Sequence, residues 1–123
     1  MSPWKICTIC MVVSATLILF PPRAHAVFMT GKSLLSLCNS TNKDNMFACE
    51  NYIAGVVDYH TLVRSLGTAP SVDFCLPANI KMQQITIMVR NYLTARPEQQ
   101  GFVAAPAVAL AIYNSYPCPK KKK

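Results

Sequence analysis

The fold is decided by one long stretch, residues 43–66, which reads KDNMFACENYIAGVVDYHTLVRSL. Placed at 100° per residue, its apolar side chains fall on one broad arc, the pattern of a helix that packs along one side. This arc consists of Met46, Cys49, Tyr52, Ile53, Val56, Val57, Tyr59, His60, Val63 and Leu66. Gly55 costs the helix about 1 kcal/mol relative to alanine, which suggests either the close approach of a neighbouring backbone or simple tolerance, and we favour close packing. The stretch predicts the main helix, with Ser40, Thr41 and Asn42 available to cap its start.

Three shorter helices are predicted around it. The first covers residues 31–38. The third begins at Met82 and is stopped by Arg96-Pro97, because proline cannot continue a helix. Its apolar side comprises Met82, Ile85, Met88, Val89, Tyr92 and Leu93. The last begins at Pro106, where proline suits a first turn, and ends before Tyr116. The sequence therefore predicts an all-α fold, a small four-helix bundle.

Four cysteines follow the first 26 residues, at Cys38, Cys49, Cys75 and Cys118. Four cysteines allow three pairings. Cys38 closes the first helix and Cys49 lies near the start of the second, so a tight hairpin can join them. Cys75 precedes the third helix and Cys118 follows the fourth, and antiparallel packing brings those two ends together. We predict the disulfides Cys38–Cys49 and Cys75–Cys118.

Neither a metal site nor a catalytic site is expected. Zinc would need closely spaced ligands, but no Cys-x-x-Cys pair remains after residue 26 and His60 is the only histidine there. Asp58 and His60 resemble an acid–base pair, yet residues two apart on a helix do not face each other. We expect His60 to be a core histidine and Asp58 to be solvated or to contact a partner. The sequence thus predicts no enzymatic activity and no cofactor.

Residues 1–26 have the features of a secretory signal peptide. Lys5 precedes an apolar run from Ile6 to Phe20, and Ala24-His25-Ala26 provides small residues for cleavage after Ala26. A membrane anchor is the alternative, but the run is shorter than the roughly 20 residues of a spanning helix. Export would place the cysteines in an oxidising compartment. The folded domain is then predicted to cover residues 27–118.

Half of the basic residues lie at the two ends of the chain. Of 12 lysines and arginines, Lys5 and Arg23 belong to the leader and four form the tail, Lys120–Lys123. The other six stand against five acidic residues, so the folded part is nearly neutral. We expect residues 119–123 to be a solvated, disordered tail, with a weak tether to anionic surfaces as the alternative. Nucleic-acid binding is not expected, because the folded part has no basic stripe with interleaved aromatic residues.

Four segments together carry a resemblance to a known family. They are GKSLL at residues 31–35, running on to Cys38; CENYIAGVVD at 49–58; CLP at 75–77; and YPC at 116–118. In this order they resemble the Rap/Tai immunity-protein family, small exported helical proteins of Gram-negative bacteria. The resemblance spans nearly the whole chain after the leader, and residues 49–58 are its most specific part.

The resemblance implies a periplasmic protein that binds a peptidoglycan amidase, a toxin delivered by type VI secretion, and occludes its active site. It leaves open whether the protein is a homodimer, and no membrane contact is expected after cleavage. Because the apolar arcs are needed inside the bundle, contacts with the toxin are expected at polar and loop positions. These are Asp58, Arg64 and the turn formed by Gly67, Thr68, Ala69, Pro70 and Ser71. A periplasmic chaperone or stress protein, and a secreted eukaryotic effector, are the alternative interpretations.

Overall fold

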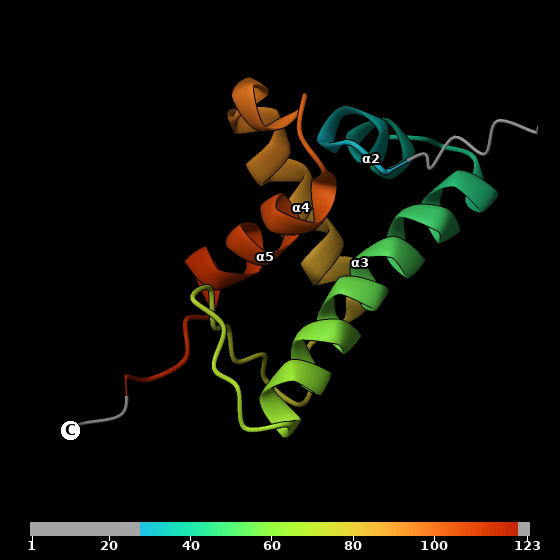
Figure 1. The fold of residues 1–123 in the computed structure, drawn as a ribbon. Helices are drawn as coiled ribbons and strands as arrows, with labels where there is room; N and C mark the ends of the chain where they lie inside the picture. Colours follow the sequence, from blue (N-terminus) through green and yellow to red (C-terminus); the bar gives the residue numbers. More distant parts are fainter. Residues whose placement is uncertain (1–27, 121–123) are drawn as a thin grey trace, which may run out of the picture.

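The structure, a computed structural model, describes residues 28–120 (Figure 1). Within this range lie four α-helices and one short 3-10 helix. They are α2 (Gly31–Cys38), α3 (Lys43–Ser65), α4 (Met82–Ala95), η1 (Pro97–Gln99) and α5 (Ala104–Ser115). The predicted all-α, four-helix bundle is confirmed. The predicted signal peptide, residues 1–26, and the last three lysines of the tail lie outside the described residues.

Side-chain caps explain where the first two helices begin. Thr30 Oγ1 accepts a hydrogen bond from Ser33 N (3.2 Å) at the start of α2. Asn42 Oδ1 accepts from Asp44 N (2.8 Å) and Asn45 N (3.2 Å) at the start of α3. These bonds satisfy first-turn amides that no earlier helical carbonyl can reach.

At the starts of α4 and α5, the backbone N–H groups have other hydrogen-bond partners. Lys81 N donates to Gln84 Oε1 (3.0 Å), so a side chain of the first turn of α4 reaches back to the residue before it. α5 begins at Ala104, two residues before the predicted start at Pro106, so that prediction was wrong. Ala104 N donates to Met29 O (2.8 Å), an acceptor from the other end of the domain that lets the helix start earlier. Pro106 then lies in the first turn, where its missing N–H costs nothing.

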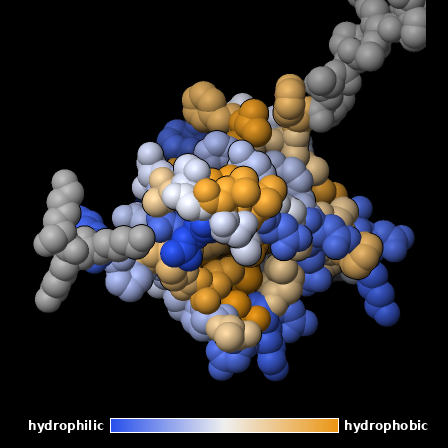
Figure 2. All heavy atoms as spheres, turned by 60° about the horizontal axis from the view of Figure 1, so that its bottom comes forward, coloured by the Kyte–Doolittle hydropathy of each residue, from blue (hydrophilic) through white to orange (hydrophobic). Residues whose placement is uncertain are grey.

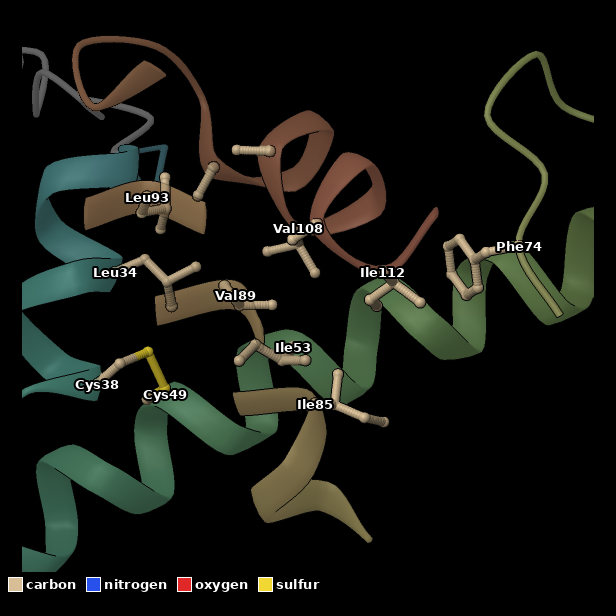
Figure 3. Packing of buried hydrophobic residues seen from close by; sticks show 13 residues of the cluster. Leu34, Cys38, Cys49, Ile53, Phe74, Ile85, Val89, Leu93, Val108 and Ile112 are labelled. Carbon is tan, nitrogen blue, oxygen red and sulfur yellow. A yellow bond between two sulfur atoms is a disulfide. The ribbon is translucent and has the colours of Figure 1, made fainter. Parts of the chain in front are cut away.

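All four helices contribute to one core (Figure 3). Fully buried side chains come from each of them: Leu34 of α2, Ile53 of α3, Val89 and Leu93 of α4, and Val108 and Ile112 of α5. Phe74, from the segment between α3 and α4, lies at the end of this row next to Ile112. Thr86 of α4 is also buried, although the predicted apolar side of that helix does not include it. The side of α4 that faces the core therefore includes Thr86 as well as the predicted apolar residues.

α3 is covered on only part of its predicted arc. Cys49, Ile53 and His60 are buried. Tyr59 (68% exposed) and Leu66 (73% exposed) were predicted to lie on the packed side and instead face solvent, so the predicted arc was too wide. Figure 1 shows the reason, because the other helices all lie to one side of α3. Among residues 28–120, neither α3 nor any other helix combines the length and hydropathy of a membrane span.

Both predicted disulfides, Cys38–Cys49 and Cys75–Cys118, are confirmed, with Cα atoms 5.2 and 4.8 Å apart. Loop-closure entropy gives the shorter ring about 3 kcal/mol of stabilisation and the longer ring about 4 kcal/mol. The second disulfide is reinforced by two backbone hydrogen bonds. Cys75 N donates to Tyr116 O (2.8 Å), and Cys118 N donates to Asp73 O (3.0 Å). The end of the domain is thereby tied to the segment that follows α3.

Two glycines provide a matched test of this packing. A Cβ added at Gly31 would lie 2.7 Å from Gln99 O, whereas one added at Gly55 would meet no atom within 4 Å. The close approach predicted at Gly55 was therefore wrong, and it occurs at Gly31. We expect Gly55→Ala to raise the free energy of unfolding by about 0.5–1 kcal/mol and Gly31→Ala to lower it by about 1 kcal/mol or more. Urea unfolding of both variants measures this, and a stabilised Gly31→Ala would contradict the packing.

Candidate functional site

The last turns of α3 meet the segment after it around a buried histidine. His60 is 8% exposed, and its ring stacks on Phe74 with 3.7 Å between centroids and 14° between planes. His60 Nε2 lies 3.3 Å from Phe74 N, which donates to it, and 3.2 Å from Asp73 Oδ1. One nitrogen cannot accept from the amide and carry a proton at the same time. Neutral His60 with its proton on Nδ1 can therefore accept from Phe74 N, whereas a proton on Nε2 would be donated toward Asp73 instead.

Burial decides which form is present. It is the largest influence on His60 and lowers the pKa of the imidazole below its ordinary value of 6.5. Asp73 acts in the opposite direction and Arg64 in the same direction as burial. Arg64 Nε lies 3.1 Å from Asp73 Oδ1, so the carboxylate already has a cationic neighbour. His60 is thus neutral near pH 7 and binds the Phe74 amide, in agreement with the predicted core role.

This histidine makes the stability depend on pH. Because the pKa of His60 is lower in the folded protein than its ordinary value of about 6.5, the unfolded chain takes up the proton first as the pH falls. We expect the free energy of unfolding to be highest above about pH 7 and to decrease as the pH is lowered through about 6.5. Urea unfolding across this range, with His60→Gln as the control, measures it. Equal pH dependence of the two proteins between about pH 7 and 5.5 would show that His60 is not responsible.

The acidic partner of His60 is Asp73, not Asp58, which is exposed on α3. Sequence reasoning missed this pairing because the two residues are 13 positions apart on different segments. Asp73 is the only acidic residue between α3 and α4 and lies two residues before Cys75, which is the signal that could have identified it. The cluster holds the segment after α3 in place. Thr61, the nearby hydroxyl, donates to Val57 O (2.9 Å) instead of to His60.

A second feature is an apolar hollow on the opposite side of His60, which we call the α3–α5 groove. It has a volume of about 440 Å³ and lies between α3, the start of α5 and the loop that joins α3 to α4. Its lining is Val56, Tyr59, His60, Val63, Thr68, Pro70, Val72, Ala105, Pro106 and Ala109. A neighbouring hollow of about 400 Å³ shares three of these residues, Val56, Tyr59 and Ala105, and extends along α3 past Gly55. The two together form one apolar depression.

The structure brings part of the predicted contact turn to this groove. Thr68 and Pro70 line it, and Gly67 adopts φ +81°, a left-handed conformation that favours glycine and turns the chain out of α3. Ala69 and Ser71 are exposed. Arg64 instead belongs to the cluster around Asp73, and Asp58 is exposed outside the groove lining. The turn and the groove form one surface, which neither Arg64 nor Asp58 lines.

Exposed apolar residues border the same region. Tyr59, Leu62 and Leu66 are exposed and follow one another at helical spacing on α3. Figure 2, which looks toward the end where α3 terminates, shows hydrophobic side chains in patches bordered by hydrophilic ones. Exposed apolar patches next to a groove are typical of protein-binding surfaces. The groove and these side chains together form an exposed apolar surface.

Comparison with known proteins agrees with this architecture. A family model described as Rap1a immunity proteins matches residues 30–118, a range that contains all four described α-helices and both disulfides. No curated protein and no solved structure matches the chain. The match covers well over half of the 123 residues. On this match, the chain belongs to the Rap1a immunity protein family.

Proposed function

We propose that this protein is exported to the periplasm, where it binds a peptidoglycan amidase toxin delivered by type VI secretion and blocks its active site. Membership of an immunity protein family carries the proposal, because such a protein implies a cognate toxin as its partner. The features of a signal peptide in residues 1–26 and the two disulfides favour an oxidising compartment. The amidase as target comes from the resemblance to the Rap/Tai proteins.

The toxin contact is assigned to the α3–α5 groove and the turn Gly67–Ser71 beside it. This surface combines a loop, which can enter an enzyme cleft, with exposed apolar side chains that can be buried on binding. Arg64 and Asp58 are weaker candidates for the contact, and we expect them to affect binding less than the apolar residues do, because neither lines the groove. The disulfide Cys75–Cys118 and the His60 cluster hold the segment directly after the turn, which limits the ordering entropy that would be lost on binding.

A survival experiment tests the function. Deleting the gene in a strain with an intact amidase toxin gene is expected to make the cells sensitive to toxin-producing siblings, and expression of the full chain should restore survival. The matched control is the chain lacking residues 2–26, which should not rescue, because it would remain in the cytoplasm. In vitro, an equimolar amount of oxidised protein should stop peptidoglycan hydrolysis by the purified amidase. Unchanged survival of the deletion strain, with no complex between the purified proteins, would contradict the proposal.

The alternative is a periplasmic chaperone or stress-type binding protein. The exposed Tyr59, Leu62 and Leu66 are the observation that favours it, because a chaperone would also present apolar surface. The two functions differ in stoichiometry and selectivity. A chaperone would suppress aggregation of several unrelated unfolded proteins, whereas an immunity protein would form one tight complex with a folded toxin. Light scattering of heat-aggregated citrate synthase without reductant, with and without the oxidised protein, distinguishes them.

A further inference from the structure

The two disulfides have different surroundings. Cys38 and Cys49 are both 0% exposed and lie in the core between α2 and α3 (Figure 3). Cys75 and Cys118 are both partly exposed. Cys75 also borders a hollow of about 280 Å³ whose wall includes His60 and Arg64. A thiol in solution can therefore reach the second disulfide in the folded protein, whereas the first is accessible only when the helices separate.

The two sulfur atoms of the accessible disulfide also differ. Arg64 Nη1 donates to Cys75 Sγ at 3.2 Å. Among the hydrogen bonds and ion pairs of residues 28–120, Cys118 Sγ has no such cationic donor. A guanidinium group stabilises negative charge on an adjacent sulfur, and a better-stabilised thiolate leaves faster in thiol–disulfide exchange. When this disulfide is cleaved, the favoured leaving group is thus the Cys75 thiolate.

The position of Cys118 allows the attack that this requires. It lies three residues after the end of α5, and its neighbours Pro117, Pro119 and Lys120 are exposed. Exchange proceeds with the attacking thiolate, the attacked sulfur and the leaving sulfur in line. The exposure of these neighbours leaves Cys118 open to an incoming thiol.

We propose that Cys75–Cys118 is a thiol-exchange site for an extracytoplasmic dithiol, with Cys118 as the attacked sulfur and Cys75 as the leaving thiolate. One thiolate of the dithiol forms a bond to Cys118 Sγ, the bond between the two cysteines breaks, and the electron pair stays on Cys75 next to Arg64. The second thiol of the dithiol then attacks its own mixed-disulfide sulfur. Cys118 leaves as a thiolate and takes up a proton. The dithiol is oxidised to a disulfide, and two electrons reduce the protein.

Reduction would release the chain end. The backbone hydrogen bonds from Cys75 N to Tyr116 O and from Cys118 N to Asp73 O are the remaining ties between the segments on either side of the disulfide. Without the covalent bond these two hydrogen bonds, made by partly exposed residues, can open locally, while the core disulfide Cys38–Cys49 keeps α2 on α3. Thiol exchange at Cys75–Cys118 does not depend on which toxin the protein binds.

Mapping of thiols by mass spectrometry tests the site. The oxidised full domain is treated with increasing dithiothreitol and then alkylated, and we expect Cys75 and Cys118 to be labelled at least tenfold faster than Cys38 and Cys49. With glutathione as a monothiol, the trapped adduct should be on Cys118 and the alkyl label on Cys75. Equal labelling of the two disulfides, or glutathione mainly on Cys75, would overturn the proposal.

Variants of Arg64 test the role of its charge. Arg64→Gln should slow the reduction of Cys75–Cys118 about tenfold, and Arg64→Lys, which keeps a positive charge, should slow it less. The control is Arg90→Gln on α4, which lies away from the disulfide and should leave the rate unchanged. If Arg64→Gln and Arg64→Lys were reduced as fast as the unmodified protein or faster, Arg64 would not stabilise the leaving thiolate.

Discussion

Tyr59→Ala is expected to raise the dissociation constant of the toxin complex about 30-fold or more, which corresponds to about 2 kcal/mol. Tyr59 is 68% exposed and lines both hollows of the apolar depression on α3. A large aromatic side chain next to a groove is the residue type that most often dominates the binding energy of a protein interface. Isothermal titration of the purified toxin with each protein measures the effect. Because Tyr59 packs little in the free protein, the free energy of unfolding of Tyr59→Ala should differ from that of the unmodified protein by no more than about 0.5 kcal/mol.

Phe47→Ala is the matched control for Tyr59→Ala. Phe47 is 67% exposed on the same helix but lies 12 residues earlier, about 18 Å along the axis. It should bind the toxin as the unmodified protein does. Tyr59→Phe separates the ring from the hydroxyl group, and we expect it to retain most of the affinity. If Phe47→Ala weakened binding as much as Tyr59→Ala, or if only Phe47→Ala did so, the toxin would bind another part of α3.

The helices could be predicted well where their ends are determined locally. α2 begins after Thr30 and α3 after Asn42, and both caps act on amides within three residues. The disulfide pairing followed from the same helix ends. α5 could not be placed in this way, because the acceptor for Ala104 N is the carbonyl of Met29, 75 residues earlier in the chain. No local pattern contains that contact.

The candidate site was predicted only in part. The turn that carries Thr68 and Pro70 was identified from its composition, and the structure places it at the groove. The groove itself could not be predicted, because hydrophobic periodicity shows which side of α3 is apolar but not how much of it other helices cover. Tyr59 is the clearest case, since it has the spacing of a packed residue and lies at the edge of the covered side. The contact of His60 with Asp73 also depends on tertiary packing.

Phe74→Ala is expected to lower the free energy of unfolding by about 3–5 kcal/mol, the usual cost of removing a buried phenylalanine side chain. Phe74 is 3% exposed, stacks on His60 and lies at the end of the core next to Ile112 (Figure 3). Its removal leaves a cavity beside a buried imidazole, so a water molecule can enter next to His60 but cannot replace the lost packing. Urea unfolding of the oxidised proteins at pH 7.5 measures the loss, because His60 is then neutral in both states.

Phe102→Ala provides the control for this substitution, since it removes the same side chain from a position that is 67% exposed. Its free energy of unfolding should stay within about 0.5 kcal/mol of the unmodified value. Phe74→Ala should also weaken toxin binding at low temperature, where the protein is still folded. Phe74 is part of the segment that carries the contact turn, and the stacking of its ring on His60, which the substitution removes, is one of the contacts that hold this segment on α3. A destabilised Phe74→Ala that binds the toxin with unchanged affinity would show that the turn is not part of the contact surface.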